Sequence, residues 1–181
     1  MIGPPPVLQG TLISLRPLSP RDLPDLIRWY GDPEVNHWLH QSEYRDVSEG
    51  RARQKYGPGS EREGDARWII EAAGVPVGVV RLEGIEAVHG KAALGIVIGE
   101  KECWSRGYGS EAINLALAHG FRELGLRRVE LITDADNKRG IRCYEKCGFR
   151  REGLLRAHRL RFGKPLDMVV MGVLRDDLEG T

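Results

Sequence analysis

The sequence predicts an α/β fold with a mixed, mostly antiparallel sheet flanked by helices. Three observations support this class. Three apolar runs separated by turn residues lie between residues 68 and 98, helical spacing begins at Ser110, and strand patterns return after Val129. With 181 residues, 41% of them hydrophobic, the chain fits one domain over residues 1–181, with residues 1–10 as an irregular, proline-rich lead-in.

The charge balance excludes broad electrostatic recognition. The chain has 27 basic and 26 acidic residues and a formal charge of +1, so no strong field would attract nucleic acid or an anionic membrane. The N-terminus lacks the pattern of a signal peptide, and no stretch approaches the roughly 20 apolar residues of a membrane span. A cytoplasmic protein without nucleic-acid or membrane partners is expected.

The first elements follow from proline and glycine positions. Residues 12–15 alternate as a strand that Pro17 ends, and Ser19 then suits the N-cap of a helix with Leu23, Leu26, Ile27 and Tyr30 on its apolar side. A short helix is expected over 34–39. Residues 46–56 have a helical composition, and residues 57–64 read as a loop.

The remaining elements follow from changes in periodicity. Strands are predicted at 68–72, 77–82 and 92–98, forming an antiparallel meander, and a long amphipathic helix from Ser110 to the stop signal at Gly125. A strand at 129–133, a helix at 137–147 and a final hairpin of strands 155–162 and 166–174 complete the order.

The three cysteines argue for thiols. Cys103, Cys143 and Cys147 are an odd set, so a disulfide framework is not expected. Cys143 and Cys147 share one face of a predicted helix and could share a metal, but His119 and His158 belong to other elements and do not complete a ligand set. Buried thiols are favoured, with no metal.

A glycine turn is the first candidate binding feature. Arg106, Gly107, Tyr108, Gly109 and Ser110 precede the long helix, whose first backbone amides and dipole favour an anion. Glycine lets phosphate oxygens approach the main chain, while Arg106 and Ser110 add side-chain donors, so the turn suits a diphosphate. A plain strand-to-helix connection that needs glycine is the alternative.

The same turn also fits the G-x-G-x-x-A pattern of dinucleotide-binding folds, with Glu130 near the position of a ribose-binding acid. In such folds the strand runs directly into the first glycine. Here residues 100–106 intervene, and the preceding strands look like hairpins. A nicotinamide-dependent oxidoreductase is therefore the less favoured interpretation.

At this point the chain resembles the GNAT superfamily of N-acetyltransferases. The resemblance is carried by residues 93–98, the turn at 104–110 and, most specifically, the block D-N-K-R-G-I-R-C-Y-E-K-C-G-F at 136–149. It extends over about residues 12–174, and the motif W-Y-G-D-P-E-V at 29–35 is similar to the branch of ribosomal-protein N-terminal and spermidine acetyltransferases. It implies a GNAT-like sheet with a splayed parallel pair, acetyl-CoA as acetyl donor and a homodimer.

Two positions depart from the family pattern. Its turn often begins with Gln or Arg, where this chain has Trp104, as much of this branch does. Many relatives have Ala or Ser after the Asn-x-x of the second block, where this chain has Gly140, which is expected to loosen the first helical turn by up to ~1 kcal/mol. Neither change removes the backbone cradle.

The resemblance also implies roles for individual residues. The pantetheine arm would pair with exposed backbone near Val97 and Ile98, and the pyrophosphate with the amides of residues 106–110. Asn137 would bond the pantetheine, or serve only as a helix N-cap. Tyr144 matches the family's general acid for the departing thiolate; a tyrosine merely packed against the sheet is the alternative.

The acceptor side is less defined. The resemblance places the amine (a protein N-terminus, a polyamine or a small-molecule amine) near Glu34, His37, Trp38 and Glu43, with a helix pair and solvated acids as the alternative. Glu83 is a further candidate for the substrate side, and no base is assigned among Glu83, Glu86, Asp134 and Asp136. A non-catalytic acyl-CoA sensor on the same fold is the competing function.

Overall fold

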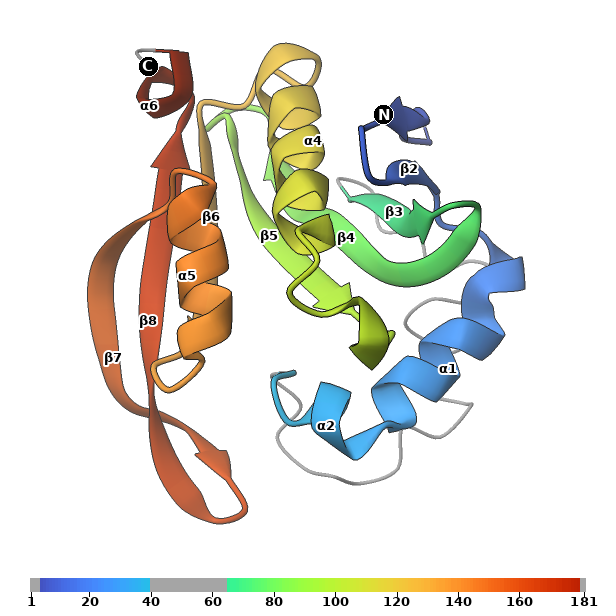
Figure 1. Cartoon of the computed structure of the whole chain (residues 1–181). Helices are drawn as coiled ribbons and strands as arrows, with labels where there is room; N and C mark the ends of the chain where they lie inside the picture. Colours follow the sequence, from blue (N-terminus) through green and yellow to red (C-terminus); the bar gives the residue numbers. More distant parts are fainter. Residues whose placement is uncertain (1–3, 40–64, 180–181) are drawn as a thin grey trace.

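The computed structural model describes residues 4–39 and 65–179. The protein is built on a mixed sheet (Figure 1). Its described strands form an eight-stranded sheet in the order β1-β2-β3-β4-β5-β6-β8-β7. Only β5 and β6 are parallel, and the other neighbours are antiparallel. The predicted mixed, mostly antiparallel sheet is confirmed.

The elements follow the order that the sequence predicts. They are β1 (Leu8–Gln9), β2 (Ser14–Pro17), the 3-10 turn η1 (Pro20–Asp22), α1 (Leu23–Gly31), α2 (Pro33–Asn36), β3 (Ala66–Ala72), β4 (Val75–Glu86), β5 (Lys91–Ile98), the 3-10 turn η2 (Lys101–Cys103), α4 (Tyr108–Arg122), β6 (Arg128–Asp134), α5 (Lys138–Lys146), β7 (Arg150–Arg161), β8 (Lys164–Leu174) and α6 (Arg175–Glu179).

The N-terminal part differs most from expectation. The lead-in predicted to be irregular contains β1, because Leu8 and Gln9 pair with β2. The helix predicted over 34–39 is only the single turn of α2, where the Asp32 side chain accepts hydrogen bonds from the amides of Glu34 and Val35 at 2.9 and 3.3 Å. The segments 46–56 and 57–64 lie outside the described residues.

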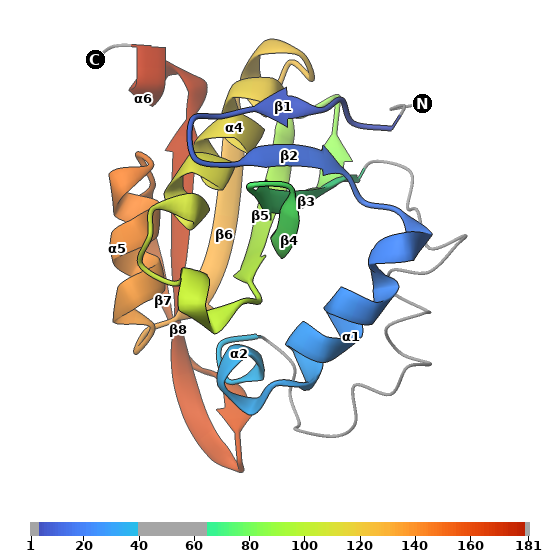
Figure 2. The same ribbon diagram turned by 45° about the vertical axis from the view of Figure 1, so that its right-hand side comes forward.

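Two hydrophobic layers cover opposite faces of the sheet, because side chains alternate along each strand. Trp68 and Ile70 of β3 pack toward α4, while Ile69 between them packs with Trp29 and Leu26 of α1. Figures 1 and 2 show the result: α4 and α5 lie on one side of the sheet, and α1 and α2 on the other. Within residues 4–39 and 65–179, no helix is long and apolar enough to cross a membrane.

Glycines end the helices that the periodicity predicts. Gly125 after α4 has a φ of +65° and Gly148 after α5 a φ of +90°, the left-handed conformation that stops a helix at little cost for glycine. β7 and β8 then form a long hairpin that turns at Gly163 and reaches past α5 (Figure 1). This hairpin brings its far end near α2 (Figure 2).

Candidate active site

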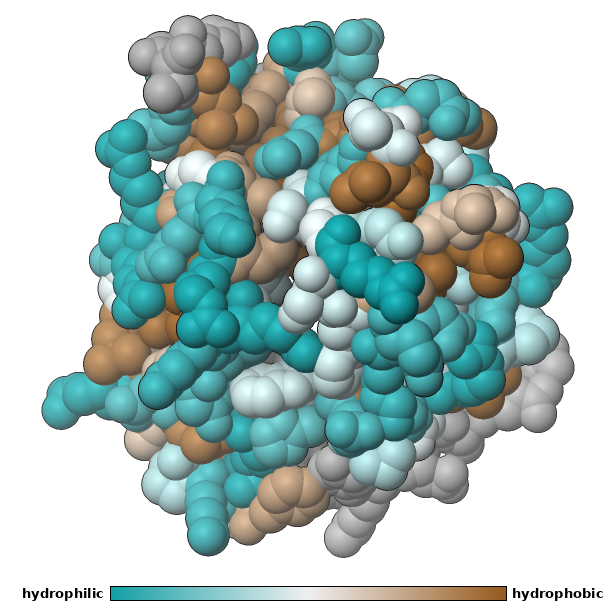
Figure 3. All heavy atoms as spheres, viewed as in Figure 1, coloured by the Kyte–Doolittle hydropathy of each residue, from teal (hydrophilic) through white to brown (hydrophobic). Residues whose placement is uncertain are grey.

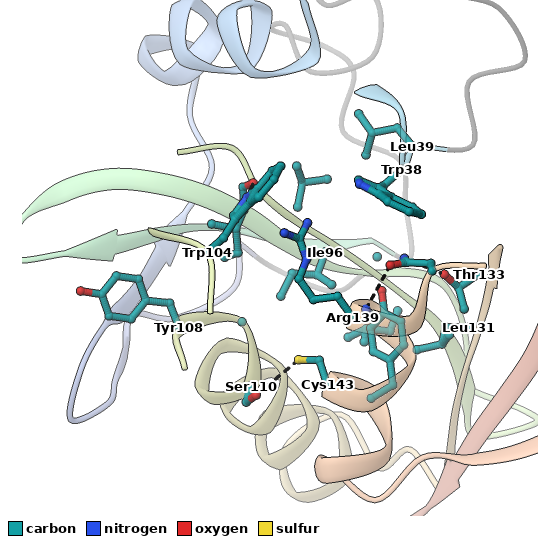
Figure 4. Close-up of a pocket in the computed structure, with 18 of the residues that line it drawn as sticks. Trp38, Leu39, Ile96, Trp104, Tyr108, Ser110, Leu131, Thr133, Arg139 and Cys143 are labelled. Carbon is teal, nitrogen blue, oxygen red and sulfur yellow. Dashed lines mark hydrogen bonds between the residues drawn. The ribbon is translucent and has the colours of Figure 1, made fainter. Parts of the chain in front are cut away.

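A cleft of about 670 Å³ opens where β5 and β6 separate. The two strands pair only from Lys91 and Arg128 to Ala93 and Glu130, after which residues 94–98 and 131–133 line opposite walls. The first turn of α4 and one side of α5 complete the lining (Figure 4). The splayed parallel pair therefore creates the cavity. Much of the molecular face over α5 and β7 is hydrophilic (Figure 3).

The backbone of β5 presents hydrogen-bonding groups to this cleft. Gly99 donates its N–H to the carbonyl of Val77 on β4 at 2.9 Å. The backbone N–H and C=O groups of successive strand residues point to opposite neighbours. Those of Val97 therefore also point toward β4, whereas those of Ile96 and Ile98 point into the gap toward β6. Of the two residues predicted for pantetheine pairing, the geometry favours Ile98, together with Ile96.

The glycine turn has the geometry of an anion cradle. Ser105 and Gly107 have φ values of +62° and +87°, and such left-handed residues curl successive amides into a concave nest. Gly107 is the N-cap of α4 and has no side chain to cap it, so the amides of Tyr108, Gly109 and Ser110 remain available at the positive end of a 15-residue helix.

Most of the predicted turn residues line the cleft: Gly107, Tyr108, Gly109 and Ser110. Arg106 is exposed and is not among the lining residues. The 3-10 turn η2 separates β5 from the turn, so the strand does not run into the first glycine as it would in a dinucleotide fold.

Asn137 begins α5 and also lines the cleft. Its side-chain oxygen accepts from the amide of Gly140 at 3.0 Å, and its nitrogen donates to Thr133 Oγ1 at 3.1 Å. A Cβ on Gly140 would lie 2.5 Å from this Asn137 nitrogen. Glycine at 140 therefore accommodates the N-cap, and the contact of Asn137 with pantetheine stays a prediction.

Tyr144 lies on α5 in the wall of the same cleft, edge-on to Phe149 with ring centroids 6.1 Å apart. Burial and the neighbouring Cys143 raise the pKa of its phenol above the ordinary value, and the charge of Arg81 partly offsets this rise. The phenol is therefore protonated at neutral pH.

Two thiols, one on α5 and one at its C-cap, lie beside the glycine turn. Cys143 lines the cleft 3.3 Å from Ser110 Oγ, and Cys147 is buried, 3.6 Å from the Ser110 carbonyl. All three cysteines are free. Among the described residues, no cluster of three His, Cys, Asp or Glu side chains is arranged as a metal ion would require.

Trp104 and Arg139 meet across the cleft, a contact that the sequence patterns did not indicate. The Trp104 indole N–H donates to the Ile98 carbonyl at 2.8 Å, and the Arg139 guanidinium carbon lies 3.9 Å from the ring centroid (Figure 4). Such a cation–π pair joins the β5 side of the cleft to α5. Burial lowers the pKa of Arg139. No local spacing relates residues 104 and 139, so only the fold reveals the pair.

The candidate acceptor residues separate into two groups. Trp38 and Glu83 line the cleft. Glu34 does not: it is 68% exposed and bonds Lys101 Nζ at 2.6 Å. His37 is also outside the lining and lies 3.1 Å from Arg161. Glu43 lies outside the described residues.

The acids considered as bases are all in ion pairs. Glu83 Oε1 is 2.9 Å from Arg81 Nε, and the exposed Glu86 is 3.2 Å from Lys91 Nζ. Asp134 is buried and bound by two arginines, one of which also binds Asp136. Among these four acids, only Glu83 lines the cleft.

The carboxyl group of Asp134 makes the stability of the fold depend on pH. Burial alone would raise its pKa, but the hydrogen bonds and charges of Arg159 and Arg161 outweigh burial, so its pKa is lowered. The unfolded chain therefore binds the proton more readily. The stabilisation is complete above the unfolded pKa of about 3.9 and is lost as the pH falls through the folded pKa.

We expect Asp134→Asn to lower the free energy of unfolding at pH 7 by about 2 kcal/mol, because two charged hydrogen bonds are weakened. It should also flatten the loss of stability below about pH 4. Urea unfolding from pH 3 to pH 7 measures both effects. Asp176→Asn, at an 87% exposed side chain, is the control and should behave as the wild type. Equal curves for all three proteins would contradict the prediction.

The family model described as the acetyltransferase (GNAT) domain matches residues 13–150. The chain therefore belongs to the GNAT family and is an acetyl-CoA-dependent N-acetyltransferase.

Among curated relatives, the uncharacterized N-acetyltransferase p20 of Bacillus licheniformis is 26% identical over 93% of this chain and 96% of its own length. The spermidine N(1)-acetyltransferase of Escherichia coli is 30% identical over 79% of this chain and 75% of its own. A solved spermidine N-acetyltransferase from Vibrio cholerae, in complex with CoA and spermine, has a TM-score of 0.83 at 25% identity, covering 93% of this chain and 98% of that one.

Proposed function

We propose that this chain transfers the acetyl group of acetyl-CoA directly to a primary amine, with Tyr144 as the general acid. The observation that carries the proposal is the meeting of three features in one cleft: the amide nest of the glycine turn, the open backbone of β5 and the phenol of Tyr144. Each suits a different part of the donor or of the reaction.

The residues present fit acetyl-CoA. The amides of Gly107 to Ser110 would hold its pyrophosphate, and Arg142 and Lys146 on the cleft side of α5 add positive charge. Ile96 and Ile98 would pair with the pantetheine, as an added strand pairs with a sheet edge, and Asn137 would bond the same arm. A Cβ on Gly109 would contact Cys143, Ile98 and Ile96 at 3.8–3.9 Å, so glycine keeps this part of the cleft open.

Acetyl-CoA supplies an activated thioester, which a neutral amine can attack without a covalent enzyme intermediate. The C–S bond breaks as the C–N bond forms, and Tyr144 gives its proton to the departing sulfur. The phenolate recovers a proton from solvent, while the amine nitrogen loses one. The raised pKa of Tyr144 keeps it protonated before the reaction.

The relatives named for spermidine make a polyamine the first acceptor to test. Trp38 and Leu39 of the cleft wall would contact the acceptor, with Glu83 nearby. Glu34 is less suited to this role, because it is exposed and paired with Lys101.

A screen for release of the CoA thiol tests the function. Spermidine, a peptide with a free N-terminus and an aminoglycoside are each offered with acetyl-CoA. We expect release with at least one amine and none with its fully N-acetylated form, because an acetylated nitrogen is no longer nucleophilic. Acetyl-CoA binding in calorimetry without release for any amine would instead indicate a sensor. The predicted homodimer would be tested by sedimentation of the same protein.

A further inference from the structure

We propose that Arg161, anchored on the buried Asp134, positions Trp38 in the acceptor-side wall of the cleft. Arg161 would thus set the affinity for the acceptor without touching it, and is a positioning residue. The inference rests on the proposed amine acetylation, and it concerns a contact between β7 and the segment after α2.

The anchor of this arrangement is the buried carboxylate of Asp134, which two arginines bind. Asp134, at the end of β6, is 1% exposed. Its carboxylate accepts hydrogen bonds from Arg159 Nε at 2.6 Å and Arg159 Nη2 at 2.5 Å, and a further bond from Arg161 Nη2. Two guanidinium groups on one buried carboxylate fix the direction of both arginine side chains, because the forked donors allow few geometries.

From this anchor, Arg161 reaches the segment that follows α2. Its Nη1 lies 3.1 Å from His37 Nε2, and its guanidinium carbon lies 5.5 Å from the centroid of the Trp38 ring. The His37 and Trp38 rings are nearly perpendicular, with centroids 4.6 Å apart. One guanidinium therefore contacts both rings.

The same cluster also touches the next residue of the wall. Arg159 Nη1 approaches the Leu39 carbonyl at 3.4 Å. Trp38 and Leu39 line the cleft, whereas Arg159 and Arg161 do not. The arginines stand behind the wall and the two apolar side chains form its surface, as the labels in Figure 4 show for Trp38 and Leu39.

Local structure cannot hold Trp38 by itself. α2 is a single turn of four residues, too short to be stable alone, and Trp38 lies two residues after its end. The side chain is half-buried, and its direction depends on groups from other elements. The Asp134 cluster, defined as Asp134, Arg159 and Arg161, supplies those groups from the sheet.

The first test is Arg161→Gln, which removes the charge and the contact with the Trp38 ring. We expect the acceptor KM to rise about tenfold, in the range of measured couplings between contacting residues, while kcat and the KM for acetyl-CoA stay unchanged. Arg161→Lys keeps a positive charge beside Asp134 but lacks the planar fork, so it should retain the melting temperature and still raise the acceptor KM.

Arg151→Gln is the matched control. Arg151 lies on the same strand and pairs with Glu145 at 2.9 Å, but its side chain is 58% exposed and it does not line the cleft. This control should leave both KM values unchanged. An equal rise of the acetyl-CoA KM in Arg161→Gln, or a fall of kcat alone, would overturn the proposal, since either would show an effect beyond the acceptor wall.

A double-mutant cycle tests whether Arg161 acts through Trp38. Trp38→Ala should raise the acceptor KM by itself, and Arg161→Gln should add little in that background, because the side chain it positions is absent. If the acceptor KM of the double variant instead rises by the product of the two single increases, Arg161 acts by another route and the proposal is overturned.

A measurement without turnover separates this inference from the proposed function. In protein labelled with 5-fluorotryptophan, the resonance of Trp38 is assigned with Trp38→Phe. We expect Arg161→Gln to move or broaden that resonance and to leave those of Trp29 and Trp68 in place. An unchanged Trp38 resonance overturns the positioning role, whereas failure of every amine in the acetylation screen counts against the function only.

Discussion

Replacing Tyr144 with phenylalanine should lower turnover by about 10²-fold and leave the affinity for acetyl-CoA unchanged, because general acid catalysis typically contributes a factor of this size. The phenol lies in the cleft wall, and burial keeps it protonated by raising its pKa. Phenylalanine preserves the ring and its edge contact with Phe149, so only the hydroxyl is tested.

Single-turnover rates measure the chemical step directly, and calorimetry with acetyl-CoA measures binding. A fall in both affinity and rate would mean that the hydroxyl holds the donor instead of the leaving sulfur. An unchanged single-turnover rate would remove Tyr144 from the mechanism altogether. A raised pKa also makes the phenol a weaker acid. The rate that remains in the phenylalanine variant shows how far solvent can replace the phenol as the proton donor.

Gly107→Val should weaken acetyl-CoA binding by at least about tenfold, the expected loss when a hydrogen bond to a charged group is disrupted. Gly107 has a φ of +87° at the N-cap of α4, where a β-branched residue is strained. The variant would either move the turn or fill the space in front of its amides, and both changes disrupt the nest.

Gly125→Val is the control that separates the effect of backbone strain from the effect of disrupting the amide nest. Gly125 has a φ of +65° after α4, and a Cβ there would meet no atom within 4 Å. Both variants should lose about 1–2 kcal/mol of stability through the left-handed backbone. Only Gly107→Val should lose affinity in titrations with acetyl-CoA. Equal affinity in the two variants would place the phosphates elsewhere.

The sequence by itself determined most of the fold that surrounds the cleft. Period-two runs predicted β3, β4 and β5, helical spacing predicted α4 and α5, and the glycines marked their ends. These are local signals, because the backbone direction and the exposed face of an element follow from neighbouring residues. It was the resemblance to the GNAT superfamily that placed the glycine turn, Asn137 and Tyr144 in one site, and all three line one cleft of the structure.

The tertiary structure decided which of the candidate acceptor residues line the cleft. Of the residues that the resemblance placed beside the amine, Glu34 pairs with Lys101 outside the cleft, while Trp38 forms part of its wall. The sequence offered Asp134 only as an ambiguous base, yet two arginines from β7 bind it in the core. No spacing rule relates β6, β7 and the segment after α2, because contacts between distant elements depend on how the sheet and its long hairpin fold in space. Local spacing thus determined the elements that carry the glycine turn and Tyr144, whereas contacts between residues far apart in the sequence bring β7 against the segment after α2.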